Sequence, residues 1–102
     1  MYQLGFFSST DDQLKVIFTL LKNRLRPVIT HEEYAYSKGN KKVFVPVVMC
    51  KDVDIDETIG DIKVFTKDDI IFIENDVLKY QFPKKYLGLI LSRMQKALQF
   101  KV

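Results

Sequence analysis

The chain has 102 residues, of which 47% are hydrophobic, and its formal net charge is +3. Length and apolar content predict one domain with a single core and exclude an intrinsically disordered chain. No apolar run approaches the roughly 18 residues of a membrane span. The start of the chain lacks the basic segment of a signal peptide, and the single cysteine excludes an intrachain disulfide. We therefore expect a cytoplasmic protein without a membrane partner.

The first two predicted elements are a strand and a helix. Tyr2–Phe7 has the short apolar pattern of a strand. Thr10 and Gln13 have the spacing of a capping box, which predicts that a helix begins there. Pro27 predicts that this helix ends near Leu25, because the residue before a proline disfavours helical geometry.

Two β-rich runs follow the helix. Val28–Tyr36 and Lys42–Cys50 flank the loop Ser37–Lys41, an arrangement that is typical of a β-hairpin. Pro46 lies inside the second run and cannot donate a ladder hydrogen bond. We therefore expect this run to be an edge strand or to contain a bulge.

Shorter strand-like runs lead to a second helix. Asp52–Asp56 alternates as a short exposed strand or an extended loop does. Pro83 suits the first position of a last helix that continues to about Gln99. The short turns favour antiparallel neighbours, and each helix has one apolar stripe. We expect a single α+β domain over residues 1–102, with a mainly antiparallel sheet and two helices on one face. Its remaining strands are predicted at Asp61–Thr66, Ile70–Glu74 and Val77–Phe82.

The two predicted helices share a faint sequence similarity. Leu14–Leu25 aligns without a gap on Leu87–Leu98, and a strand-like run precedes each segment. This similarity predicts two pseudo-symmetric strand-loop-helix halves with a cleft between them. Two unrelated helices that each bury one face would share the same apolar positions, so both explanations stay open. The identical pairs are Leu14/Leu87, Ile17/Ile90 and Leu25/Leu98.

Charge is distributed unevenly along the chain. Residues 1–51 carry a net charge of +4, residues 52–76 carry −7, and residues 77–102 carry +6. The pattern has two interpretations. Either lysine-rich helix surfaces lie beside acidic loops, or the surface is polarised and one side suits an acidic partner.

No pattern in the sequence indicates catalysis or a cofactor. Asp52-x-Asp-x-Asp56 opens like a calcium loop, but Glu57 replaces the glycine at its sixth position and Lys63 the acid at its twelfth. His31 is the single histidine, which excludes a zinc site built from several histidines. A dyad of His31 with Cys50 would need a strand register that the sequence does not specify. We expect no enzymatic activity, no metal and no cofactor.

Two lysines break a local rule near the start of the last helix. Lys84 and Lys85 fall in its predicted first turn, where cations oppose the helix dipole. Free helix N–H groups and two ammonium groups would bind a phosphate or a carboxylate, and nearby aromatic residues would wall an adjoining groove. A lysine-rich solvated surface is the alternative. The candidate binding residues of this region are Tyr80, Phe82, Lys84, Lys85 and Tyr86.

Aromatic residues also alternate with lysines in the predicted hairpin. Such stretches bind nucleic acid by stacking on bases and neutralising phosphates, which makes Tyr34 and Tyr36 candidate binding residues. Tyrosine has a high strand propensity, so a half-buried hairpin explains the same pattern. The stretch consists of Tyr34, Tyr36, Lys38, Lys41, Lys42 and Phe44.

Over its whole length, including the opening Met-Tyr-Gln-Leu-Gly-Phe-Phe, the chain resembles the small orphan proteins of filamentous viruses that infect hyperthermophilic archaea. The resemblance rests on no diagnostic motif and transfers no functional residue. It implies a thermophilic viral protein that is made in the cytoplasm of an archaeal host cell and acts on host or viral macromolecules.

These observations together favour a non-enzymatic interaction module. We expect it to bind a protein or peptide segment, in a groove or at a sheet edge, during infection. The alternative is a nucleic-acid-binding accessory protein that uses the basic terminal segments. Exposed strand edges also permit a homodimer.

Overall fold

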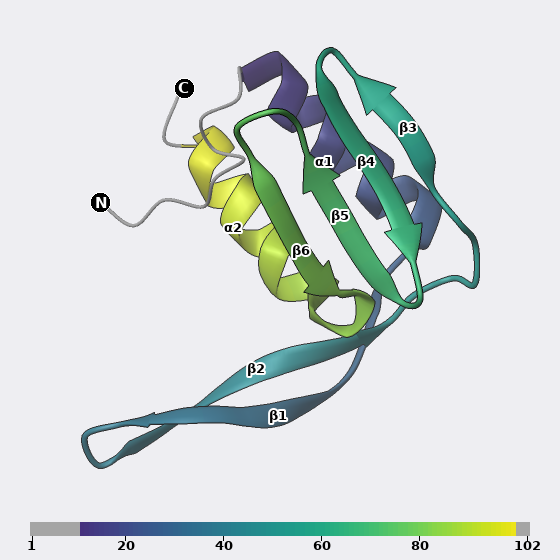
Figure 1. The fold of residues 1–102 in the computed structure, drawn as a ribbon. Helices are drawn as coiled ribbons and strands as arrows, with labels where there is room; N and C mark the ends of the chain where they lie inside the picture. The colour runs from purple at the N-terminus through teal and green to yellow at the C-terminus, as the bar shows by residue number, and fades with distance from the viewer. Residues whose placement is uncertain (1–10, 100–102) are drawn as a thin grey trace.

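The computed structural model describes residues 11–99, which form two α-helices, a 3₁₀ turn and six strands (Figure 1). The predicted strand Tyr2–Phe7 and the predicted cap at Thr10 lie outside the described residues. In chain order the elements are α1 (Asp11–Leu25), β1 (Val28–Lys38), β2 (Lys41–Met49), β3 (Asp56–Ile59), β4 (Ile62–Lys67), β5 (Ile70–Glu74), β6 (Lys79–Pro83), the 3₁₀ turn η2 (Lys84–Tyr86) and α2 (Leu87–Gln99).

The described strands form two separate antiparallel sheets. β3, β4, β5 and β6 follow one another in a four-stranded meander, and β1 pairs with β2 alone. Both helices lie against one face of the meander, while the β1–β2 pair projects away from it (Figure 1). We call the meander with its two helices the body, and the β1–β2 pair the ribbon. The α+β class, the antiparallel pairing and the placement of both helices on one face are confirmed.

The core of the body forms because each element turns an apolar face inward. The helices bury residues spaced three or four apart, and β4 and β5 bury alternate residues, as their periodicities require. Each fully buried aliphatic side chain contributes roughly 1.5–3 kcal/mol. The buried residues of α1 are Leu14, Ile17, Leu21 and Leu25, those of β4 and β5 are Ile62, Val64, Ile71 and Ile73, and those of α2 are Leu87, Ile90, Leu91 and Met94.

The opposite face of the meander is open, because no described element lies over it (Figure 1). Phe65 and Phe72 are cross-strand neighbours there, and their rings stack with centroids 4.7 Å apart and planes 7° apart. Lys63 lies opposite Glu74 on the same two strands. Cross-strand pairs of this kind stabilise a sheet face that no helix covers.

The ribbon is the longest strand pair among the described residues. Gly39, at φ 63°, provides the left-handed backbone geometry that its two-residue tip turn needs. At the other end, Val47 and Val48 are 6% and 5% exposed because this end of β2 packs against the body. Gly88 of α2 leaves room for Val48, since a Cβ at that position would lie 2.9 Å from the valine Cγ1. β2 pairs with β1 alone among the described strands, which confirms the edge strand predicted from Pro46.

Several predicted element boundaries are confirmed, and most of the others differ by one or two residues. α1 ends at Leu25, the hairpin is present, and β5 has its predicted bounds. Residues 52–55 form a connection, so the extended-loop alternative is correct for them, and the strand begins only at Asp56. The hairpin loop shortens from the expected five residues to a two-residue turn, because both strands continue to its base.

The expectation that Pro83 begins the last helix is wrong. Pro83 pairs with Ile70 as the last residue of β6. The Lys84 N–H then donates to the Asp69 carbonyl oxygen at 2.9 Å. These contacts extend the strand, so the chain makes a 3₁₀ turn before α2 begins at Leu87.

Five of the six residues in the identical pairs of the two helices are buried, and the sixth, Leu98, is partly buried. Leu14 and Leu87 are 2% and 0% exposed, and Ile17 and Ile90 are 0% and 4% exposed. Two helices that pack on one sheet face must both bury such positions, which explains these identities without a common origin. The strand that would open the first half lies outside the described residues, so internal duplication stays a prediction.

Candidate functional site

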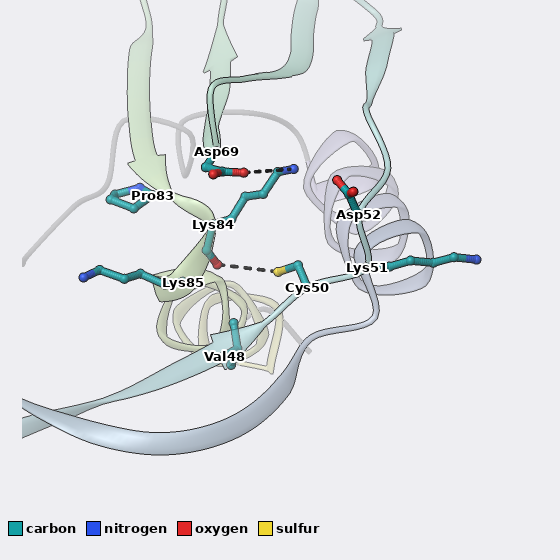
Figure 2. Close-up of a pocket in the computed structure, with 8 residues that line it drawn as sticks. All are labelled: Val48, Cys50, Lys51, Asp52, Asp69, Pro83, Lys84 and Lys85. Carbon is teal, nitrogen blue, oxygen red and sulfur yellow. Dashed lines mark hydrogen bonds and ion pairs between the residues drawn. The ribbon is translucent and has the colours of Figure 1, made fainter.

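A cavity of about 330 Å³ lies where the ribbon joins the body (Figure 2). The end of β2, the connection after it, the β4–β5 turn, the end of β6 and η2 all contribute to its walls. Three lysines and two aspartates give the lining a net positive charge. The lining residues are Val48, Cys50, Lys51, Asp52, Asp69, Pro83, Lys84 and Lys85.

Lys84 is held in this cavity by acceptors from two other segments. Its Nζ donates to the Val53 carbonyl oxygen at 3.5 Å and lies 3.9 Å from Asp69 Oδ1, and its side chain is 13% exposed. Asp68 and Asp69 have φ values of 53° and 64°, a left-handed geometry that aspartate tolerates in two-residue hairpin turns. The β4–β5 turn therefore positions the Lys84 side chain at the cavity wall.

Cys50 faces the same cavity but is poorly suited to nucleophilic chemistry. Its thiol donates to the Lys84 carbonyl oxygen at 3.6 Å (Figure 2). Burial raises the pKa of the Cys50 thiol above its ordinary value of 9.0, and the Lys84 ammonium offsets part of the rise. The reactive thiolate is therefore scarce at neutral pH. The His31 ring contacts Thr30 Oγ1 at 2.9 Å and Glu33 Oε2 at 3.7 Å, and no contact between His31 and Cys50 is present among the described side chains.

Glu33 joins the ribbon to η2. The Tyr86 hydroxyl donates to Glu33 Oε1 at 3.2 Å, and Lys85 Nζ lies 3.6 Å from the same oxygen. The Lys85 ammonium also lies over the Tyr86 ring, 5.1 Å from its centroid. We call Glu33, Lys85 and Tyr86 the clamp. It fastens the middle of β1 to the body, and Glu33 is the one β1 residue that is partly buried.

The structure places the two lysines of the predicted anion site in a different element and beside carboxylates. Lys84 and Lys85 lie in η2, so the prediction that they occupy the first turn of the last α-helix is wrong. Each ammonium group already has a carboxylate neighbour, Asp69 for Lys84 and Glu33 for Lys85. An incoming phosphate or carboxylate would compete with these groups, and anion binding here stays a prediction.

Of the aromatic residues predicted to wall a groove beside these lysines, two pack together in the body and one belongs to the clamp. Phe82 is 6% exposed and belongs to the core. Tyr80 is partly buried against the core, and its ring centroid lies 5.6 Å from that of Phe82. Tyr86 belongs to the clamp. Of the five residues predicted in this region, Lys84 and Lys85 are the two that line the cavity.

The two candidate tyrosines of the hairpin lie on the ribbon, and each is 54% exposed. Sequence reasoning missed the exposed aliphatic residues at the other end of the ribbon, next to the body. Their pattern in the sequence is the same as that of a half-buried strand, so only the position of the ribbon outside the body reveals their exposure. The exposed large apolar residues of the ribbon are Val28, Ile29, Tyr34, Tyr36, Phe44 and Met49.

The described strands present free edges of different length. β3 has four residues, two of them acidic, β6 has five residues and ends in Pro83, and β2 has nine residues with Pro46 among them. β1 has eleven residues, and its outer edge faces no described strand. Short, charged or proline-bearing edges discourage the addition of a strand, whereas long exposed edges favour it. The outer edge of β1 is therefore the best candidate among these edges for pairing with another chain.

No protein-family description, curated protein or solved structure matches this chain. Within residues 11–99, no helix has the length and apolar character needed to cross a membrane. In the same residues, no three His, Cys, Asp or Glu side chains gather as metal ligands do. The geometry of the ribbon and of the adjoining cavity is thus the basis for a functional interpretation.

Proposed function

We propose that this protein is a non-enzymatic interaction module that binds a protein or peptide segment along the outer edge of β1. One observation carries the proposal: ten of the eleven β1 residues are exposed, and the outer edge of the strand faces no described strand. An extended segment adds to such an edge through main-chain hydrogen bonds, and neighbouring side chains select its sequence. In the context that the viral resemblance implies, the segment belongs to a host or viral protein met during infection.

Exposed apolar side chains on both faces of the ribbon beside this edge support the proposal. Val28 and Ile29 of β1 are 64% and 65% exposed, and Met49, which pairs with Val28, is 68% exposed. Covering such side chains with a partner removes apolar surface from water and contributes roughly 25 cal/mol per Å². These side chains thus provide affinity, and the main-chain edge provides orientation.

The local structure of β1 also bears on what kind of partner fits. Register shifts at Thr30 and Ala35 interrupt the strand, which favours a short added segment over one that follows all of β1. Glu32 and Glu33 lie near its middle. Antiparallel pairing of two copies there would oppose like charges, so a different chain is favoured over a homodimer at this edge.

Peptide selection followed by two matched substitutions tests this function. Peptides enriched from a random library by the wild-type protein are titrated against Ile29→Lys and Val16→Lys. Val16 lies on α1 and is 50% exposed, so it controls for the chemistry of the substitution. We expect Ile29→Lys to weaken binding by about 10-fold or more, because the interface would desolvate an ammonium group, and Val16→Lys to leave it unchanged.

Amide hydrogen exchange locates the bound peptide. We expect the β1 amides to exchange more slowly in the complex than in the free protein, because the added strand gives them hydrogen-bond partners. A library that yields no enriched peptide, or equal losses in the two variants, would contradict binding at the β1 edge.

Nucleic-acid binding through the basic terminal segments is the second candidate, and one observation favours it. The acidic segment 52–76 forms β3, β4, β5 and their connections. Both helices lie against one face of the sheet that contains these strands (Figure 1). None of the exposed lysines of these helices forms an ion pair with a described residue, although Arg24 of α1 pairs with Glu57 of β3 at 3.4 Å. Binding of labelled DNA across a salt series tests this candidate, and its absence at low salt would exclude it. The exposed helix lysines are Lys15, Lys22 and Lys96.

A further inference from the structure

The charge and the exposure of the ribbon change beyond the clamp. We call residues 34–44 the ribbon tip. All of them except Val43 are exposed, and this part of the ribbon projects farthest from the body (Figure 1). The tip contains three lysines and no acidic residue, whereas the part of the ribbon near the body contains Glu32 and Glu33. The positive charge of the ribbon is therefore concentrated at its free end.

The three tip lysines have no compensating charge. Lys38, Lys41 and Lys42 are exposed, and none of them forms an ion pair with a described residue. On the open face of the meander, by contrast, Lys63 and Lys79 both lie opposite Glu74 in neighbouring strands. The local charge of the tip is thus available to an anionic partner.

The strand register of the tip places like charges against each other. Lys38 lies directly opposite Lys41, with Lys42 next in the same strand. Like charges in this position destabilise an antiparallel pair. Successive strand residues point to opposite faces, so Lys42 lies on the face opposite to Lys38 and Lys41. The tip therefore carries positive charge on both faces at the expense of its own stability, and such local conflicts are typical of functional sites.

Two of the three aromatic residues of the tip, Tyr34 and Phe44, are engaged with each other. The Tyr34 ring packs edge to face on Phe44, with centroids 6.0 Å apart and planes at 74°. The Tyr34 hydroxyl also shares a hydrogen bond of 2.7 Å with Ser37 Oγ. These contacts order the ribbon next to its lysines. They indicate an ordered arm that presents charge, and they argue against a platform on which unstacked bases would lie.

We infer that the ribbon tip binds the phosphate backbone of duplex DNA from within the major groove. This groove is about 12 Å wide in B-DNA and admits a two-stranded β-ribbon. A tip inserted there has a phosphate backbone on either side, which suits lysines on both of its faces. Phosphates near Lys38 and Lys41 also remove the repulsion between these two residues, so DNA binding and ordering of the tip reinforce each other. The deep, narrow major groove of A-form RNA does not admit the ribbon.

This inference goes beyond the proposed peptide-binding function and does not depend on it. The peptide edge uses the part of β1 near the body, and the second candidate function uses the terminal segments. Ile29→Lys tests the peptide edge without changing the tip, and substitutions in the tip leave Ile29 in place. The two proposals can therefore fail separately.

Fluorescence anisotropy of a labelled duplex DNA of mixed sequence, measured from about 50 to about 200 mM salt, tests the inference. The tip variant carries Lys38→Gln, Lys41→Gln and Lys42→Gln. Three neutralised phosphates add about −2.7 to the slope of log K against log salt, which corresponds to roughly a 40-fold loss of affinity over this range. We expect the tip variant to lose this part of the slope. Its affinity near 100 mM salt should fall on the order of 100-fold.

A second triple variant controls for net charge. Lys63→Gln, Lys67→Gln and Lys79→Gln remove the same charge from exposed lysines on the open face of the meander. We expect this variant to bind DNA as the wild type does. Equal losses in the two triple variants would overturn the assignment to the tip. The single variant Lys41→Gln should remove about 0.9 from the slope, and it provides the test if the triple tip variant fails to fold.

Two competitors distinguish duplex DNA from other anions. Poly-glutamate that displaces the duplex at equal charge concentration would identify a general site for acidic chains and overturn the inference. Single-stranded DNA that binds more tightly than the duplex would overturn the assignment to the major groove. Preference for the duplex over both competitors, together with the changes in slope, supports it.

Discussion

Ile73 of β5 and Ile29 of β1 are the same residue type in the same kind of strand, yet the first is fully buried and the second is 65% exposed. The difference comes from their neighbours. β5 lies between β4 and β6 and has both helices on one face, whereas β1 has β2 on one edge and no described strand on the other. In the body, apolar residues therefore stabilise the fold. In the ribbon, they remain available to a partner.

The body and the ribbon should also differ in what holds them together. The body has a continuous core that both helices share. The ribbon is attached by the clamp and by Val47 and Val48, and a two-stranded pair alone is marginally stable in water. We therefore expect the body to resist local changes in the ribbon, and the ribbon to respond to changes at its attachment points.

Replacing one isoleucine in each region tests this comparison with the largest expected effect on the free energy of unfolding. Ile73→Ala leaves a cavity in the core and should lower the free energy of unfolding by about 2–5 kcal/mol. Ile29→Ala removes an exposed side chain and should change it by no more than about 0.5 kcal/mol. Urea denaturation followed by circular dichroism measures both. Similar losses in the two variants would mean that the ribbon is buried in solution and would break the comparison.

Removing the clamp carboxylate tests how the ribbon is attached. Glu33→Ala deletes the hydrogen bond from Tyr86 and the ion pair with Lys85, and we expect a loss of about 1 kcal/mol. Amides of β1 and β2 should exchange faster, while those of β5 keep their protection. Glu32→Ala, at the exposed neighbouring position, is the control and should change little. Unchanged exchange in the Glu33 variant would show that other contacts attach the ribbon.

The buried thiol at the junction predicts a pH dependence. The pKa of Cys50 is raised in the folded protein by burial, so at rising pH the unfolded chain loses this proton first. The contribution to stability is therefore complete below the ordinary value of 9.0 and is lost as the pH rises through the folded value. Denaturation from pH 8 to pH 11 should show a steeper loss for the wild type than for Cys50→Ala. Parallel curves would mean that the thiol is solvated in the folded state.

The smallest expected effect concerns the opposed lysines of the ribbon tip. Lys41→Gln removes the like-charge contact with Lys38 and should stabilise the ribbon by about 0.2–0.5 kcal/mol. Slower exchange of the amides near the tip, at low salt, measures this gain. The same variant should bind DNA more weakly, so stability and binding change in opposite directions. Faster exchange would show that the tip lysines help to order the ribbon.

Local chemistry explains which structural predictions are correct. Pro27 ends α1 at Leu25, and short polar turns at Asp68–Asp69 and Asn75–Asp76 delimit β5, because these signals act over a few residues of chain. Pro83 shows the limit of such signals. A proline suits both the end of an edge strand and the start of a helix. Pairing with Ile70 and the bond from Lys84 to Asp69 decide between the two, and both partners lie on another strand or turn.

The candidate site was predictable only in part. The sequence identified Lys84 and Lys85 as exceptions to a local rule and Tyr34 and Tyr36 as part of a basic aromatic stretch. It did not indicate that Glu33 contacts Tyr86, which lies 53 residues further along the chain. It also did not indicate that Lys38 opposes Lys41, because that pairing depends on the length of the tip turn.

The sequence by itself determined the helices, the antiparallel strands other than β3 and the α+β class, because periodicity, turn residues and proline act through local sterics and hydrogen bonding. Only the tertiary structure decided that the hairpin stands apart from the meander and that five segments enclose the cavity at its base. Burial depends on which surfaces meet, and residues far apart in the chain supply those surfaces. Similar apolar strands could therefore become core in one region and an exposed edge in the other.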